Sequence, residues 1–81
     1  MTPREVCSEI KRELSEREFL CAKMYARGNG MHTIGAELFI SPKTADAHIN
    51  RTKIRLKLAS RQELIALFIY AGIINPYDPR A

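Results

Sequence analysis

Apolar residues recur at three- and four-residue intervals along most of the chain, the spacing of one face of an α-helix. No run shows the strict alternation of a half-buried strand. The pattern predicts helices over about residues 3–12, 15–28, 31–38 and 42–57, and a final helix between residues 60 and 72. We therefore expect an all-α fold.

Three of these helices are expected to begin with a capping box, in which a Ser or Thr hydroxyl and a Glu carboxylate each accept a hydrogen bond from the other residue's backbone amide. The pairs are Thr2 with Glu5, Ser15 with Glu18, and Ser60 with Glu63. The first helix would be marginal without packing, so residues 1–13 form either this helix or a frayed terminal extension. Gly28 tolerates the left-handed conformation and is expected to end the second helix.

Residues 38–55 indicate one helix ending, a tight turn, and another helix beginning. Ser41 can cap the second of these helices by accepting a hydrogen bond from the amide of Thr44, and Pro42 supplies the preset φ of a first helical position. Ile40, just before the cap, is placed for a hydrophobic staple. The segment therefore predicts two helices held together by a short turn.

The helix that begins at Pro42 has an apolar face and a polar face when residues are placed about 100° apart. The residues expected to pack inward are Ala45, Ile49, Thr52 and Leu56. The residues expected to project outward are Lys43, Asp46, Ala47, Asn50, Arg51 and Ile54. Residues 41–61 hold six basic side chains and one acid, a net charge of +5, while the rest of the chain carries −1.

A cationic, polar helix face held against a preceding helix suits the major groove of double-stranded DNA. For a lone basic helix a solvated face is the ordinary alternative, and only the turn, the cap and the charge asymmetry together favour DNA. His32 lies beside the amides that begin the 31–38 helix, which lacks a strong side-chain cap. Those amides could meet a phosphate or be solvated.

The apolar residues exceed what one small core can bury. The final helix is apolar nearly all round, so we expect one face of it to contact a partner. The residues of that face are Ala66, Ile69, Tyr70 and Ile73. Three further residues, Phe19, Leu20 and Met24, need cover from the N-terminal helix or from a second subunit.

Composition narrows the function classes. A chain of 81 residues with 46% hydrophobic content is one small folded domain, for which oligomerisation is a common supplement. The two cysteines and two histidines form no zinc pattern, so we expect no metal or other cofactor and free thiols in a reducing cytoplasm. We expect no signal peptide, no membrane span and no small-molecule substrate. The sequence shows no nucleophile, carboxylate pair or phosphate-binding loop that would indicate an enzyme, so we expect none.

Short motifs and single residues follow one another in a set order along the chain. They are residues 14–18, Gly28, Ile34, residues 38–44, His48, residues 56–58 and residues 60–63. This order resembles the LuxR-type (GerE/FixJ-like) helix-turn-helix DNA-binding domain in its stand-alone form, over about residues 14–72. The resemblance implies an all-α, four-helix domain, here with the short N-terminal helix as a possible addition. We expect an extension over 1–13, the domain over 14–74 and a tail over 75–81.

The resemblance also implies function, namely binding of promoter DNA as a homodimer. In the four-helix domain, which begins after residues 1–13, the third helix (about 42–57) would lie in the major groove, and the fourth, the final helix of the chain, would form the dimer contact. It assigns base contacts to Asp46, Ala47 and Asn50 and phosphate contacts to Lys43, Thr44 and Arg51. Lys53 and His32 complete the expected DNA-binding set. An ion pair between Arg61 and Glu18 would join the first and fourth helices.

Some positions depart from the family pattern. Asp46 stands where the family often has Lys or Arg, Thr52 where it prefers an apolar residue, and Ile54 where it is often basic. Residues 30–33 replace a more polar stretch. An acid facing the groove repels phosphate, although it can accept a hydrogen bond from cytosine N4.

Two hypotheses follow. The first is a transcription regulator that binds a DNA sequence as a homodimer. The second is a protein-interaction module that dimerises with a larger LuxR-type regulator and modulates it, with weak or no DNA binding of its own; Asp46, Ile54 and the exposed apolar residues motivate it. Replacing Lys43 and Arg51 discriminates between the two, because only a DNA binder depends on these cations.

Overall fold

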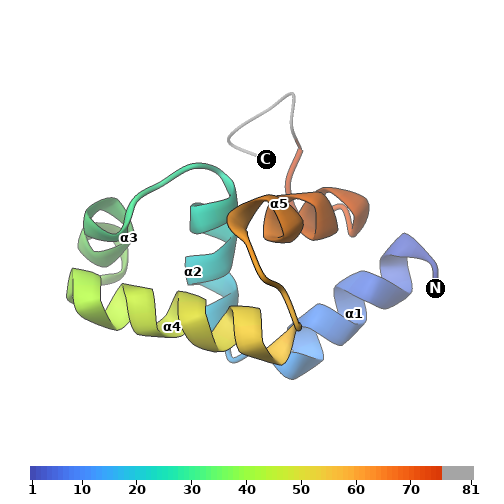
Figure 1. Cartoon of the computed structure of the whole chain (residues 1–81), viewed down its shortest axis with the longest axis horizontal. Helices are drawn as coiled ribbons and strands as arrows, with labels where there is room; N and C mark the ends of the chain where they lie inside the picture. The colour runs from blue at the N-terminus through green and yellow to red at the C-terminus, as the bar shows by residue number, and fades with distance from the viewer. Residues whose placement is uncertain (76–81) are drawn as a thin grey trace.

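Helices make up most of residues 1–75, the part of the chain described by the computed structural model (Figure 1). They are α1 (Pro3–Glu13), α2 (Glu16–Ala26), α3 (Met31–Leu38), α4 (Pro42–Arg55) and α5 (Arg61–Tyr70). The all-α prediction is confirmed, and residues 3–13 form a helix, not a frayed extension. Of the tail expected over 75–81, residues 76–81 lie outside the described residues.

The three capping boxes are present as predicted, at the starts of α1, α2 and α5. In each box the Ser or Thr hydroxyl accepts a hydrogen bond from the third helical amide, and the Glu carboxylate accepts one from the cap amide. In the first box, hydrogen bonding to the backbone and hydroxyl of Thr2 lowers the pKa of the Glu5 carboxyl below its ordinary value. Local sequence therefore determines where these helices begin.

Four helices, α2 to α5, end in a Schellman motif, in which a residue in the left-handed region turns the chain back on the last carbonyls; in α3 this residue is Phe39 (φ 58°). Gly28 (φ 103°) ends α2 and Gly72 (φ 75°) ends α5. After α4 the left-handed position is taken by Lys57 (φ 57°), and the amide of Leu58 donates to the carbonyl of Lys53 at 2.8 Å. This motif ends α4 at Arg55, two residues before the predicted end.

Helix α2 is at the centre of the fold, because it packs against each of the other four helices. Figure 1 shows α3 on one side of α2, and α1 and α5 on the other, while α4 runs from α3 past α2 to the end of α1. Helices α3 and α4 also pack directly on each other. The helix-turn-helix pair and the α1–α5 pair are thus joined through α2.

The core has two clusters, one on each side of α2. The smaller, between α2, α3 and α4, consists of Cys21, Ile34, Ala45 and Ile49. The larger combines α1 and α2 with α5 and the residues after it, and consists of Ile10, Leu14, Ala22, Ala26, Leu64, Phe68, Ala71, Ile73 and Ile74. Burial in the smaller cluster raises the pKa of the Cys21 thiol, although nearby Arg17 opposes the shift.

The N-terminal helix supplies part of the cover that α2 was expected to need. Phe19 packs against the larger cluster with its ring centroid 6.1 Å from that of Phe68, and the ammonium of Lys11 lies 5.8 Å from the Phe19 ring. Met24 is half-buried against the smaller cluster. Leu20 stays 37% exposed.

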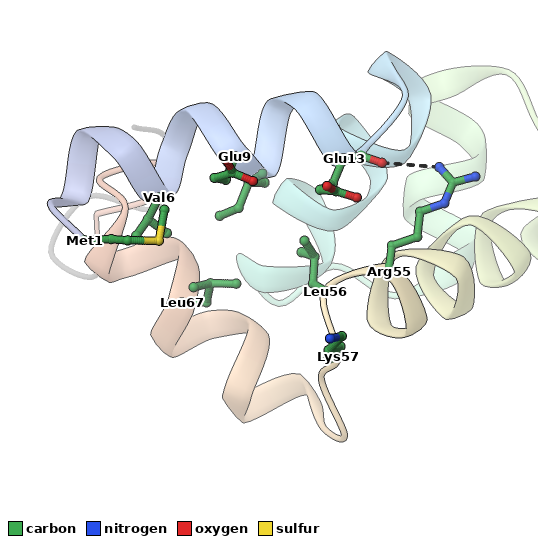
Figure 2. A pocket seen from close by; sticks show the side chains of 9 residues that line it. Met1, Val6, Glu9, Glu13, Arg55, Leu56, Lys57 and Leu67 are labelled. Carbon is green, nitrogen blue, oxygen red and sulfur yellow. Dashed lines mark hydrogen bonds between the residues drawn. The ribbon is translucent and has the colours of Figure 1, made fainter.

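A cleft of about 530 Å³ lies between α1, the end of α4 and α5 (Figure 2). The apolar side chains of Val6, Ile10, Leu56 and Leu67 line it, and charged residues of α1 and α4 flank them. The cleft contains no residue of α3, and it meets the helix-turn-helix pair only at the last residue of α4, Arg55.

Candidate nucleic-acid interface

The turn between α3 and α4 spans residues 39–41 and depends on a close approach at Gly35. A Cβ atom added to Gly35 would lie 2.6 Å from the carbonyl oxygen of Ile40. The amide of Ile40 donates to the Gly35 carbonyl at 2.9 Å. Phe39 takes the left-handed conformation (φ 58°) and its side chain is 93% exposed. The backbone of the turn therefore lies directly against α3.

The start of α4 has the predicted geometry. Ser41 is the N-cap, its hydroxyl accepts from the amide of Thr44 at 3.1 Å, and Pro42 is the first helical residue. The Ser41 hydroxyl also donates to the Thr44 hydroxyl at 2.9 Å. Ile40, predicted as a staple, packs against the cluster that holds Ala45. These contacts fix the direction in which α4 leaves the turn.

The inward face of α4 is buried as predicted. Ala45 and Thr52 are fully buried and Ile49 is 2% exposed, while Leu56 packs half-buried against the larger cluster. Thr52 replaces an apolar residue without leaving an unsatisfied polar group, because its hydroxyl donates to the carbonyl of His48 at 2.8 Å. The hydroxyl therefore costs little in the core.

The opposite face of α4 is open to solvent. Its exposed residues are Lys43, Thr44, Asp46, Asn50, Arg51 and Ile54, with Ala47 half-buried among them. None of these side chains belongs to either core cluster. We refer to these seven residues as the outward face of α4. His32 is exposed in the first turn of α3, which has no side-chain cap.

This geometry is that of a helix-turn-helix motif with a solvent-exposed second helix. The family model of the bacterial regulatory proteins of the luxR family (GerE) matches residues 12–68, which is most of the chain. The chain belongs to the luxR family. No curated protein and no solved structure matched it.

Membership identifies the chain as a helix-turn-helix domain of a regulatory, DNA-binding family, and this family is not one of enzymes. The family match covers α2, α3 and α4 completely and begins only at the last residues of α1. Most of α1 therefore lies outside the segment that the luxR-family model matches.

Lys53 lies on one flank of the outward face. It is half-buried, and its ammonium is 5.4 Å from the ring centroid of Tyr25 in α2. The guanidinium of Arg61 lies 4.3 Å from the same ring. Of the expected DNA-binding residues on α4, Lys53 is therefore the one held against a neighbouring helix.

The predicted ion pair between Arg61 and Glu18 is wrong. The structure pairs Glu18 with Arg55 of α4, through the Arg55 Nη1 and Glu18 Oε1 atoms at 2.5 Å. Arg61 instead donates to two backbone carbonyls near the end of α2, those of Tyr25 at 2.8 and 3.1 Å and Asn29 at 3.2 Å. The Tyr25 carbonyl lies in the last turn of α2, at the negative end of the helix dipole, so it suits a guanidinium, and the Asn29 carbonyl lies in the loop that follows.

Sequence reasoning missed Arg55. Its Nη1 atom also donates to the carbonyl of Glu13 at 3.5 Å, as the dashed line in Figure 2 shows. Glu18 is 2% exposed, and its Oε1 accepts from the Ser15 amide at 2.9 Å as well as from Arg55. Arg55 therefore ties the end of α4 to the junction between α1 and α2. Sequence offered only one signal, a basic residue in the last turn of α4.

Two side chains of the outward face are joined by a hydrogen bond. The Asn50 side-chain nitrogen donates to Asp46 Oδ2 at 3.3 Å, across one turn of α4. Both residues are exposed. The acid that departs from the family pattern is thus bonded to a neighbour expected to contact bases.

Three of the four residues predicted to form a dimer contact are exposed. Ala66, Ile69 and Tyr70 are exposed on α5, with Ile69 38% and Tyr70 51% exposed, and the Tyr70 hydroxyl donates to the Met1 carbonyl at 2.7 Å. The inclusion of Ile73 was wrong, because this residue is only 9% exposed and belongs to the larger core cluster. The Schellman turn at Gly72 reverses the chain, so Ile73 points back into the protein.

None of the described helices is both long enough and apolar enough to cross a membrane. Within residues 1–75, no group of three or more His, Cys, Asp or Glu side chains is arranged to hold a metal ion. Cys7 and Cys21 are free thiols, one half-buried and one buried.

Proposed function

We propose that this luxR-family domain is a cytoplasmic transcription regulator that binds double-stranded DNA in a sequence-dependent way as a homodimer. Helix α4 would lie in the major groove, with Asp46, Ala47 and Asn50 toward base edges and Lys43, Thr44 and Arg51 toward phosphates. Lys53 on the flank of α4 and His32 beside the uncapped amides of α3 would add contacts to the backbone.

The observation that carries the proposal is the outward face of α4. The inward residues of α4 are buried, and the polar and cationic residues of its outward face are exposed. The segment that holds them, residues 41–61, has a net charge of +5. An α-helix with its side chains is about 10–12 Å across, and the major groove is about 12 Å wide, so α4 can lie in the groove. The cap at Ser41 and the close approach at Gly35 hold it rigidly for that purpose.

Homodimerisation would pair two copies through the exposed residues Ala66, Ile69 and Tyr70 of α5. A two-fold axis there would present two α4 helices to half-sites about 34 Å apart, one turn of DNA. Replacing Ile69 or Tyr70 with Glu places a charge in the contact, so we expect a monomer by light scattering. A variant that remains dimeric would show that the contact lies elsewhere.

The central experiment is fluorescence anisotropy of the protein on a duplex from its own upstream region, over a series of salt concentrations. Because a handful of phosphates would be neutralised, we expect log affinity to fall against log salt with a slope of roughly −4 to −6. Lys43→Ala and Arg51→Ala should each make the slope shallower by about 1. Binding that ignores salt, or no binding to any duplex, would refute the proposal.

A matched control removes two cations away from α4. Arg4 and Arg12 are exposed on α1, and Arg12 makes only a surface pair with Glu9 at 3.1 Å. Their double alanine variant lowers the net charge as much as the Lys43 and Arg51 double variant does. It should leave the slope almost unchanged, whereas an equal loss in both variants would mean that net charge alone, and not α4, drives binding.

A second candidate function is an interaction module that dimerises with a larger LuxR-type regulator. It is favoured by the apolar cleft between α1 and α5 and by the exposure of Phe39 at 93% and Ile54 at 76%. This candidate predicts that the variant lacking the Lys43 and Arg51 cations keeps its regulatory effect in cells. Loss of the effect together with DNA binding would support the DNA-binding function instead.

A further inference from the structure

The bond between Asp46 and Asn50 fixes which end of the Asn50 amide points away from the helix. A carboxylate can only accept hydrogen bonds, so the group of Asn50 that meets Asp46 must be the amide nitrogen. The Asn50 carbonyl oxygen is then the end turned away from Asp46. An exposed Asn without such a partner can turn over and offer either end.

The pair therefore offers two acceptor oxygens, one from each side chain, and the second N–H of the Asn50 amide is the donor beside them. The Asn50 carbonyl oxygen is free, and the Asp46 carboxylate has a second oxygen without a bond to Asn50. Both side chains are exposed, one helical turn apart, on the outward face of α4. Lys43 and Arg51 are exposed on the same face, so nearby cations offset the repulsion between Asp46 and phosphate.

Base edges in the major groove differ in what they offer to an acceptor. Adenine N6 and cytosine N4 are amino donors, whereas guanine presents O6 and N7 and thymine presents O4, all acceptors. Two oxygens facing guanine or thymine would be left without partners and would repel those atoms. Two oxygens facing adenine or cytosine would each gain a hydrogen bond.

We propose that Asp46 positions Asn50 so that the pair selects amino-bearing bases, adenine or cytosine, at two neighbouring positions of the operator strand that it faces. Asp46 reads one of the two bases itself and acts on the other through the Asn50 amide. The inference rests on the proposed function, because it requires α4 to lie in the major groove.

The test is selection of bound duplexes from a randomised DNA pool, followed by sequencing. For the unmodified protein we expect adenine or cytosine to exceed guanine and thymine by about tenfold at two neighbouring positions, the scale of one base-edge contact each. Asn50→Ala should abolish the preference at one of these positions and leave the other, which identifies the base that Asn50 reads.

The decisive variant is Asp46→Ala. If Asp46 holds the amide of Asn50, this variant loses the preference at both positions, including the one assigned to Asn50. If the Asn50 position keeps its preference, the positioning role is refuted. A merely structural role for Asp46 would change the thermal midpoint or the overall affinity without changing the base at one position.

Glu37→Gln is the control for the loss of one negative charge. Glu37 is exposed on α3, outside the outward face of α4. This variant should raise affinity for all duplexes slightly and leave both base preferences intact. Enrichment of guanine or thymine, or salt-dependent binding with no preference, would overturn the inference while leaving DNA binding in place. Absence of binding to every duplex would overturn both.

Discussion

The pairing of Glu18 with Arg55 can be tested by a double-mutant cycle. Glu18 is 2% exposed, and the hydrogen bonds found for its carboxylate come from the Ser15 amide and the Arg55 guanidinium. Arg55→Met keeps most of the side-chain length but removes the guanidinium. The carboxylate would then remain buried with one hydrogen bond in place of two.

The size of the effect follows from burial. Breaking a fully buried ion pair costs about 3–5 kcal/mol, and a hydrogen bond to a charged group contributes about 1.5–3 kcal/mol. The Arg55 side chain is 46% exposed, so water can reach the site and the cost is lower. We expect Arg55→Met to lower the free energy of unfolding by about 2 kcal/mol, and the thermal midpoint by about 10 °C for a domain of this size.

The assay is urea unfolding followed by circular dichroism, for Arg55→Met, Glu18→Gln and the double variant. The coupling energy should be about 1–1.5 kcal/mol, because each single variant already removes the shared interaction. The matching cycle of Glu18→Gln with Arg61→Met should be additive within about 0.5 kcal/mol, although Arg61→Met alone is destabilising. Coupling to Arg61 and not to Arg55 would refute the pairing.

Three further predictions concern the turns and the buried thiol. Gly35→Ala should destabilise the protein by about 1–2 kcal/mol in urea unfolding, since overpacking against the Ile40 carbonyl outweighs the gain of about 1 kcal/mol in helix propensity; a more stable variant would show that the turn moves freely. Lys57→Gly should raise stability by about 1 kcal/mol in thermal melts, because glycine adopts φ 57° without strain, and an unchanged midpoint would contradict this. Because burial raises the pKa of the Cys21 thiol, the folded state favours the protonated thiol. The stability that this preference contributes is present below the ordinary thiol pKa and is lost as the pH rises from there through the raised pKa. Iodoacetamide should accordingly label Cys7 first in the native protein by mass spectrometry, and equal labelling of both thiols would refute the burial argument.

The elements that sequence predicted well depend on neighbours within a few residues. The capping boxes, the Ser41 cap with Pro42, and the inward stripe of α4 need only local geometry and helical periodicity. The open face of α4 follows from the same periodicity, so its exposed residues could be named in advance.

The elements that sequence missed depend on where separate helices meet. Arg55 and Arg61 are equally basic, and only the packing of α4 and α5 around α2 decides which of them reaches Glu18. Ile73 continues the apolar pattern of α5, but the turn at Gly72 takes it into the core. The hydrogen bond between Asp46 and Asn50 has helical spacing, so a search for side-chain pairs four residues apart would have found it.

Two consecutive residues of α2 belong to different core clusters. Cys21 packs with α3 and α4, Ala22 packs with α1 and α5, and both are fully buried. A close-packed interior transmits displacement instead of absorbing it. In the proposed homodimer, a tilt imposed on α2 by a subunit docking at α5 would therefore reorient α4 as well. The contact between the subunits would then be mechanically coupled to the position of α4 on its operator, through a single turn of helix.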